Sequence, residues 1–293
     1  MHTVTITVQD APLVADVYPA ATPSANLPVL LIHGWGGSGR YWRGTAERLR
    51  AHSDVIVPDL PGVGRSLPVR RAFDMEMHLA ALEALLTHLH VPRVQLVGHS
   101  MGGGIAILLA ARQPELVDRL VLTAISLFRN DAERTFFRAI TEVSGALMHL
   151  RAPWMADLDL LRRQFATRFF FRVPNDAELL RAGFLDYLQM DRETAVASAR
   201  SAADPAINAA AGRVRAPTLL IVARQDQIMP PANVPFTQAS IPGCRVRWFE
   251  ECGHFPMIEH AEAYAAQVRD FLSKRAEEET ITIAGGRFSS TIL

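Results

Sequence analysis

The sequence predicts an α/β fold in which a mostly parallel sheet carries helices on both faces. Short apolar runs alternate with helical segments along most of the chain, and one run enters a helix through a glycine-flanked turn at Ser100. In residues 127–211 this alternation stops, and the sequence is helical with clustered aromatic side chains. A chain of 293 residues is long enough for one large α/β domain with an inserted helical subdomain.

The first part of the chain contains most of the expected strands. Residues 3–8 and 13–18 alternate in polarity on either side of a turn signal, which predicts an antiparallel hairpin. Further strands are expected at residues 28–32, 54–58, 94–97 and 120–124. Helices are expected at residues 41–51, at 75–89 behind an N-cap at Asp74, and from the turn at Ser100 to about 112.

The helical insertion divides the predicted core in two. We expect the core at residues 1–126 and 212–275, with a helical cap at 127–211 between them. The second core segment contains expected strands at 217–223 and 245–249, a helix from about 231 and a last helix at 258–274. Residues 276–293 form a tail, for which a hairpin and a disordered segment are both open.

The charge balance argues against nucleic acid or an anionic membrane as a partner, because 30 basic and 30 acidic residues give a formal net charge of zero. No stretch reaches the roughly 20 apolar residues that span a bilayer, and the N-terminal residues lack the pattern of a secretory signal. Cys244 and Cys252 are expected to be free thiols, since their spacing along a strand corresponds to about 26 Å. These features predict a cytoplasmic protein.

The turn at Ser100 has the pattern of a nucleophile elbow, Gly98-His99-Ser100-Met101-Gly102, between a strand and a helix. Such a turn strains its central residue and brings the backbone close to the positions two before and two after it. A Cβ atom at either position would clash, which accounts for Gly98 and Gly102. The hydroxyl of Ser100 would then stand at the edge of the sheet, beside the positive end of the following helix.

Two further strand ends carry the residues that an acyl-transfer triad needs. Asp226 follows the strand at 217–223 and His254 follows the strand at 245–249, so the chain order is Ser, Asp, His. We expect His254 to accept the proton of Ser100 during attack, and Asp226 to orient and stabilise the imidazole. Taken singly, Asp226 could be a turn residue and His254 a packing residue. Their joint placement at strand ends favours catalysis.

The tetrahedral intermediate of acyl transfer needs two hydrogen-bond donors for its oxyanion. We expect the backbone N–H of Met101 to supply one, and the N–H of Trp35 in the glycine-rich loop after residue 32 to supply the other. His33 and His99 flank these positions, and for both we expect a supporting role outside the reaction itself. The predicted chemistry requires neither a metal ion nor a cofactor.

Together, these motifs resemble those of the α/β-hydrolase superfamily. The matching stretches are HGWGGSGRYW (33–42), PDLPGVGRS (58–66), VGHSMGGG (97–104), ARQDQIMPP (223–231) and ECGHFPMIEH (251–260), and the resemblance extends to about residue 275. It implies an eight-stranded sheet with an antiparallel strand near its start, and a helical cap where residues 127–211 fall. Esterases that cleave the methyl ester of a pimeloyl carrier protein carry a loop similar to HGWG.

The resemblance also indicates which of the candidate activities are favoured. Related epoxide hydrolases and haloalkane dehalogenases carry aspartate where this chain has Ser100, so those activities are not expected. Hydrolases of ring-cleavage products often carry tryptophan directly after the catalytic histidine, where this chain has Phe255. This difference favours carboxylic-ester cleavage and leaves carbon–carbon, thioester and lactone hydrolysis as alternatives. A small-molecule receptor on the same fold is the alternative without catalysis.

The residues beside the motifs predict an apolar pocket for a small-molecule ester. Leu127, Phe128, Met229 and Phe255 are expected near Ser100. We therefore expect neutral esters of small to medium size as substrates, unless an arginine of the cap provides a contact for an anion. The sequence leaves the oligomeric state open.

Overall fold

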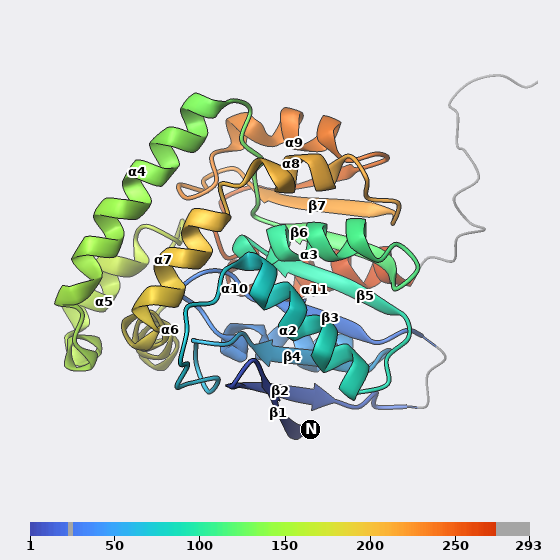
Figure 1. Cartoon of the computed structure of the whole chain (residues 1–293), viewed down its shortest axis with the longest axis horizontal. Coiled ribbons are helices and arrows are strands. Elements are labelled where there is room, and N and C mark those ends of the chain that lie inside the picture. Colours follow the sequence, from blue (N-terminus) through green and yellow to red (C-terminus); the bar gives the residue numbers. More distant parts are fainter. Residues whose placement is uncertain (23–25, 274–293) are drawn as a thin grey trace, which may run out of the picture.

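The computed structural model describes residues 1–22 and 26–273 and has the predicted α/β fold. Over these residues its sheet has eight strands, in the order β1-β2-β4-β3-β5-β6-β7-β8 (Figure 1). The strand bounds are β1 His2–Val8, β2 Ala11–Tyr18, β3 Val29–Ile32, β4 Val55–Asp59, β5 Val94–His99, β6 Val117–Thr123, β7 Thr218–Ala223 and β8 Arg245–Phe249. Strand β2 runs antiparallel to β1 and β4, and the other pairs are parallel. The predicted sheet, with its antiparallel strand near the start, is confirmed.

Helices and short 3-10 turns connect the strands. The α-helices are α1 Arg43–Leu49, α2 Met75–His88, α3 Met101–Arg112, α4 Asp131–Leu147, α5 Asp159–Ala166, α6 Ala177–Gln189, α7 Arg192–Ser201, α8 Pro205–Ala211, α9 Val234–Ser240, α10 Pro256–Glu259 and α11 Ala261–Leu272. The 3-10 turns are η1 Gly39–Trp42, η2 Met148–Leu150, η3 Pro153–Asp157 and η4 Pro231–Asn233. Within residues 1–22 and 26–273, none of these helices is long and apolar enough to cross a bilayer.

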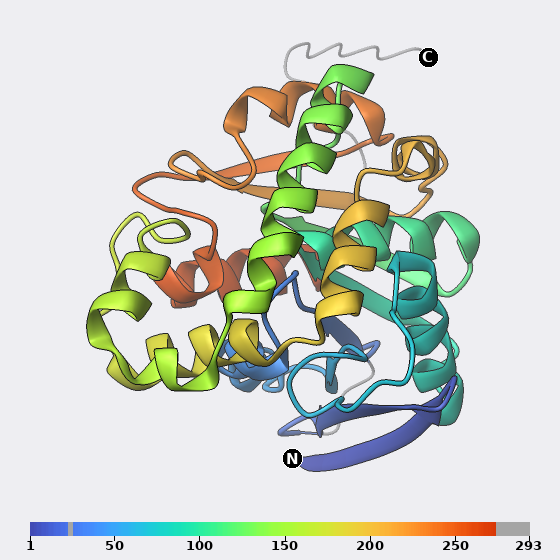
Figure 2. The same cartoon turned by 60° about the vertical axis from the view of Figure 1, so that its left-hand side comes forward.

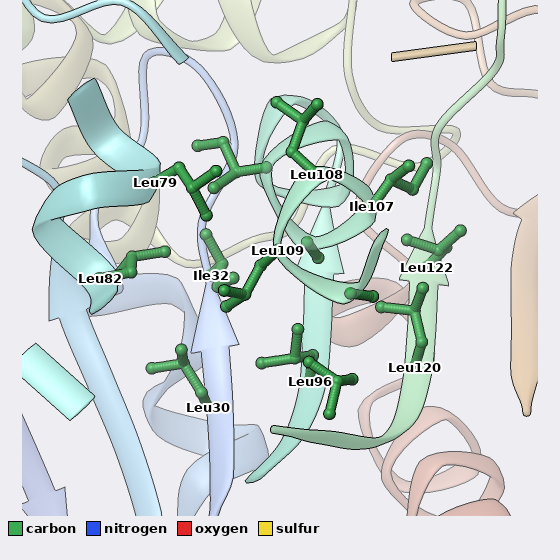
Figure 3. Close-up of a cluster of buried hydrophobic side chains, with 14 of the residues drawn as sticks. Leu30, Ile32, Leu79, Leu82, Leu96, Ile107, Leu108, Leu109, Leu120 and Leu122 are labelled. Atoms are coloured by element: carbon green, nitrogen blue, oxygen red, sulfur yellow. The ribbon is translucent and has the colours of Figure 1, made fainter. Parts of the chain in front are cut away.

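The central strands are buried on both faces, which explains their continuous apolar sequences. Successive side chains of a strand point to opposite faces. Leu30 and Ile32 of β3 belong to the cluster that contains α2 and α3 side chains (Figure 3). Val29 and Leu31 belong to the opposite cluster, with side chains of α1 and α11. Helices therefore cover both faces of the sheet, as predicted.

Several local predictions match the structure. The Asp74 side chain accepts a hydrogen bond from the N–H of Met77 at the start of α2. Cys244 and Cys252 are both buried free thiols. The helix expected from residue 41 begins two residues earlier, as the 3-10 turn η1, because the Ser38 side chain accepts a hydrogen bond from the N–H of Arg40. The tail at 276–293 lies outside the described residues.

The helical insertion lies between β6 and β7, and its helices α4 to α7 gather to one side of the sheet in Figures 1 and 2. The last helix of the predicted cap differs from these. Ile207, Ala210 and Ala211 of α8 belong to the core cluster formed with the sheet and α3. The predicted cap boundaries at residues 127 and 211 remain a prediction. By its packing, α8 belongs with the core of the sheet domain.

Candidate active site

Ser100 sits in the strained turn between β5 and α3, with φ 53° and ψ −120°. A Cβ atom on Gly98 would lie 2.5 Å from the carbonyl oxygen of Gly102. A Cβ atom on Gly102 would lie 2.5 Å from the carbonyl oxygens of Ile32 and His33, at the end of β3. Both positions therefore require glycine, and the second does so because a neighbouring strand approaches it.

His254 and Asp226 form a buried pair at the ends of β8 and β7. The His254 Nδ1 atom lies 2.8 Å from Oδ2 of Asp226, and both side chains are almost fully buried. The other carboxylate oxygen of Asp226 accepts hydrogen bonds from the backbone N–H groups of Ile228 and Met229, at 2.8 and 2.9 Å. Because a carboxylate accepts and Nδ1 donates, the Nε2 atom of His254 is left as a proton acceptor.

The structure brings the turn that carries Ser100 against this pair, through the residue before Ser100. His99, which precedes Ser100, lies with its ring centroid 4.7 Å from that of His254. Among the described residues, neither the Ser100 hydroxyl nor Nε2 of His254 has a hydrogen-bond partner. Catalytic hydrogen bonds are often long in ligand-free enzymes and shorten when substrate binds, so this geometry is compatible with a triad.

The glycine-rich loop after β3 runs directly against the turn at Ser100. A Cβ atom on Gly34 would lie 3.1 Å from the Cβ atom of Ser100. Trp35 follows, and its indole Nε1–H donates to the carbonyl oxygen of Ala195 in α7 at 2.8 Å. Met101 is the first residue of α3, where backbone N–H groups have no partner within the helix. The N–H groups of Trp35 and Met101 remain the predicted oxyanion donors.

His33 ties this loop to the end of β4. Its Nε2 atom accepts a hydrogen bond from the N–H of Leu60 at 2.8 Å, so Nδ1 carries the proton and donates to the carbonyl oxygen of Gly34 at 2.9 Å. Complete burial lowers the pKa of His33. A neutral imidazole whose two nitrogens are both hydrogen-bonded to the backbone has a positioning role and is not free to transfer a proton.

Tyr41 and His99 connect the three loops of the candidate site. The Tyr41 hydroxyl accepts a hydrogen bond from the N–H of Gly34 at 2.6 Å and lies 2.8 Å from Nδ1 of His99. The other nitrogen of His99, Nε2, lies 2.9 Å from the carbonyl oxygen of His254. Since a carbonyl oxygen only accepts, Nε2 carries the proton and Nδ1 accepts from Tyr41. Burial holds the pKa of His99 well below its usual range and raises that of Tyr41 well above it.

Glu259 joins the loop that carries His254 to the helical insertion. One carboxylate oxygen accepts a hydrogen bond from the backbone N–H of Gly253 at 2.8 Å. The other accepts from the backbone N–H groups of Phe171 and Arg172, at 2.9 and 3.2 Å. In the same contact, the N–H of His254 donates to the carbonyl oxygen of Phe169 at 2.6 Å. The sequence reasoning missed both Tyr41 and Glu259, because nothing local in their surroundings indicates partners so far along the chain.

The predicted pocket residues lie in two different cavities. Leu127, Phe128 and Met229 line an apolar cavity together with Ser100. Phe255 does not line that cavity, but its ring lies 4.9 Å from that of His99, the residue before Ser100. Its ring stacks on Phe170 with centroids 5.3 Å apart and lines a second cavity. The backbone after His254 directs Phe255 toward Phe170 of the insertion.

The second cavity is lined mainly by aromatic rings of the insertion. Its lining includes Trp35, Tyr41, Phe165, Phe184, Tyr187 and Phe255. Arg40 and Arg162 also line it, and each makes an ion pair, with Asp186 and Asp159 respectively. Among the described residues, both positively charged side chains that line this cavity are therefore already paired with a carboxylate.

Residues 28–261 match the family model described as alpha/beta hydrolase fold, so the chain belongs to the α/β-hydrolase family. It is 31% identical to a pimeloyl-[acyl-carrier protein] methyl ester esterase of Neisseria meningitidis serogroup A, over 90% of this chain and 82% of the relative. It is 33% identical to a 2-hydroxymuconate semialdehyde hydrolase of a Pseudomonas strain, over 85% of this chain and 88% of the relative.

Solved structures show the same architecture. A thermophilic esterase from Thermogutta terrifontis superimposes with a TM-score of 0.75 at 25% identity, covering 93% of this chain and 98% of its own. A hydrolase from Pseudomonas aeruginosa has a TM-score of 0.78 at 23% identity with the same coverage, which supports the fold alone. The predicted membership of an esterase-like α/β-hydrolase family is confirmed.

Proposed function

We propose that this chain is a serine hydrolase that cleaves carboxylic esters of small to medium-sized apolar molecules. The single observation that carries the proposal is the placement of Ser100. It occupies a strained turn at the wall of an apolar cavity, and the residue before it, His99, contacts His254 of the buried His254–Asp226 pair. An esterase and a methyl ester esterase among the similar proteins support the same reaction class.

In the proposed reaction, the Ser100 oxygen attacks the ester carbonyl carbon while Nε2 of His254 takes the hydroxyl proton. The N–H groups of Met101 and Trp35 stabilise the oxyanion. When the intermediate collapses, the bond to the alcohol breaks and His254 returns the proton to the leaving alcohol. Water then attacks the acyl-enzyme with His254 again as base, which releases the acid and restores Ser100. Asp226 keeps the imidazole in the required tautomer.

The lining of the Ser100 cavity supports an apolar acyl group as the preferred substituent. Leu127, Phe128 and Met229 offer no charge to a substrate, and each buried methylene contributes about 0.8 kcal/mol. Arg168 and Arg172 provide no contact for an anion in either cavity. Arg168 donates to Gln227 at 3.3 Å, and Arg172 pairs with Glu251 at 2.6 Å on the surface. Neutral esters are therefore preferred in this proposal.

Carbon–carbon bond hydrolysis is the second candidate, supported by the similarity to a 2-hydroxymuconate semialdehyde hydrolase. The same serine, histidine and aspartate would serve it, as they would for a thioester or a lactone. A receptor that binds without turnover is the candidate outside catalysis. We place the protein in the cytoplasm, in line with its two buried free thiols.

The proposal is tested with Ser100→Ala and a matched control in the same cavity. Ser126 also lines that cavity, and its buried hydroxyl has no partner among the described residues. Ser100→Ala should abolish hydrolysis of p-nitrophenyl esters and labelling by a fluorophosphonate, while Ser126→Ala keeps both. Turnover that survives Ser100→Ala in protein free of host esterases would reject the proposal. Faster turnover of a vinylogous diketone than of any ester would select the carbon–carbon alternative.

A further inference from the structure

Helix α4 presents an apolar side to the cavity and a second apolar side to solvent. On the inner side, Phe137 lines the cavity that contains Ser100, and its ring lies 5.2 Å from that of Phe128. Also inward, a Cβ atom on Gly145 would meet Val196 of α7 at 2.8 Å. In Figure 2, α4 crosses the near side of the molecule, and no other element lies in front of it.

The outer side carries a regular row of large apolar side chains, here called the α4 stripe. It consists of Phe136, Ile140, Val143 and Leu147 on α4 and Leu150 in η2, which are 69%, 49%, 63%, 58% and 74% exposed. Their spacings of four, three, four and three residues put them on one helix face, as in the seam of a coiled coil. Exposed apolar patches beyond a few hundred Å² mark interaction sites on folded proteins.

The side chains next to the stripe favour a helix as its partner. Ala132, Ala139 and Ala146 repeat every seven residues along α4 and are all exposed. Small residues beside an apolar seam let a second helix approach closely. A packed helix surface would also remove the exposed leucines and phenylalanine from water, which is favourable.

The charges around the stripe disfavour an anionic partner. Arg129 pairs with Glu133, Arg134 with Asp131, and Arg200 with Glu142. Arg138 of α4 donates instead to the carbonyl oxygen of Ala203. Because α4 carries three carboxylates and two arginines, it offers no net positive field to an acidic protein or an anionic membrane. A neutral apolar face fits best against another neutral apolar face.

We propose that the α4 stripe binds the α4 stripe of a second copy of this chain, in a symmetric dimer with antiparallel helices. A two-fold axis brings identical patches together, so the stripe has to complement only itself. The antiparallel direction opposes helix ends of opposite partial charge, whereas parallel copies would oppose like ends. The proposal does not depend on the activity proposed for Ser100.

The size of the surface indicates a weak dimer. Aromatic side chains bury about 150–250 Å² each and aliphatic ones less, so the five exposed side chains offer on the order of 500 Å² per copy. Specific interfaces start at about 1,200 Å² in total, which the neighbouring alanines help to reach. The dimer should therefore form at micromolar concentrations and dissociate on dilution.

The test is the mass of the purified full chain by sedimentation, over a concentration range of about 1 to 100 μM. The wild-type protein should pass from one chain to two. Val143→Glu should stay at the mass of one chain, because it places an unpaired carboxylate in the apolar contact. As a matched control, Leu160→Glu adds the same charge on α5, at a leucine that is 78% exposed, and should dimerise like the wild type.

A crosslink tests the same contact without weakening it. Ile140→Cys should be joined to a second chain by a short bismaleimide, since both native thiols are buried, and Leu160→Cys should not. Wild-type protein that keeps the mass of one chain at every concentration would overturn the proposal. Binding of that monomer to neutral phosphatidylcholine vesicles would instead assign the stripe to a lipid surface. A Val143→Glu protein that still dimerises would also overturn the proposed dimer contact.

Discussion

At the scale of single residues, the candidate site depends on buried polar groups that have specific partners. The Tyr41 hydroxyl accepts a hydrogen bond from the N–H of Gly34 at 2.6 Å and donates one to Nδ1 of His99 at 2.8 Å. These two partners lie in the glycine-rich loop and in the turn at Ser100. A single hydroxyl therefore holds the predicted oxyanion donors in place relative to the candidate nucleophile.

We predict that Tyr41→Phe lowers kcat more than it changes KM, because it loosens the loop of the oxyanion donors without altering the acyl cavity. It also leaves two buried polar groups unpaired, at a cost of about 1–3 kcal/mol of stability. Tyr264→Phe is the control, since its hydroxyl bonds Thr123 at 2.8 Å away from the site. Equal stability losses with unchanged kcat in both variants would contradict the prediction.

His78 should make the protein less stable in acid. It is fully buried in α2, and burial lowers its pKa from the usual 6.5 to about 3. Between these values the unfolded chain binds the extra proton, so the free energy of unfolding falls as pH falls, by about 1.6 kcal/mol between pH 6.5 and 5. Urea unfolding at both pH values should show that His78→Phe loses less free energy of unfolding in acid than the wild type does. His88→Gln, which alters an exposed histidine, serves as the control and should lose as much as the wild type.

At the scale of elements, the loop after β8 and the insertion segment at residues 169–172 form one unit. Glu259 accepts from the backbone of both, and His254 donates its N–H to Phe169. Close approach also requires Gly253, where a Cβ atom would lie 2.4 Å from the Phe169 carbonyl oxygen. The position of the candidate base is therefore set partly by the helical insertion.

We predict that Glu259→Gln destabilises the protein by about 1.5–3 kcal/mol, the value of a hydrogen bond to a charged group. The amide presents an N–H₂ group to one of the backbone donors, so one contact is lost. Activity on p-nitrophenyl esters should fall, because the loop of His254 gains freedom. Glu262→Gln, on the exposed side of α11, serves as the control. Thermal unfolding and kcat that match the control would rule out this role for Glu259.

At the scale of the whole molecule, residues of the core and of the insertion together line both the Ser100 cavity and the aromatic cavity. Phe137 of α4 closes the cavity that contains Ser100, and Phe184 of α6 lines the aromatic one. An ester has two substituents, an acyl group and an alcohol. We expect the acyl group to enter the Ser100 cavity, because its walls adjoin the nucleophile directly.

Phe137→Ala should therefore shift the preferred acyl chain toward longer p-nitrophenyl esters. Each additional buried methylene is worth about 0.8 kcal/mol, or roughly fourfold in kcat/KM. Phe184→Ala enlarges the other cavity and should leave the acyl-length profile unchanged. A shift caused by Phe184→Ala alone would place the acyl group in the aromatic cavity instead.

The sequence by itself determined the features that depend on neighbouring residues. Apolar periodicity predicted the strands of the sheet, and local sterics required glycine at residues 98 and 102 beside Ser100. The Asp226–His254 contact was also predictable, because parallel strands place their carboxyl ends along one edge. These are properties of short segments and of their order.

Only the tertiary structure decided which distant residues meet. Tyr41 reaches His99 across 58 positions and Glu259 reaches Phe171 across 88, and no short-range pattern encodes either pair. The direction of Phe255, the packing of α8 on α3 and the exposed side of α4 were likewise unpredictable. Each depends on how whole elements pack, since a side chain's partner is set by the shape of the core and not by its neighbours in sequence.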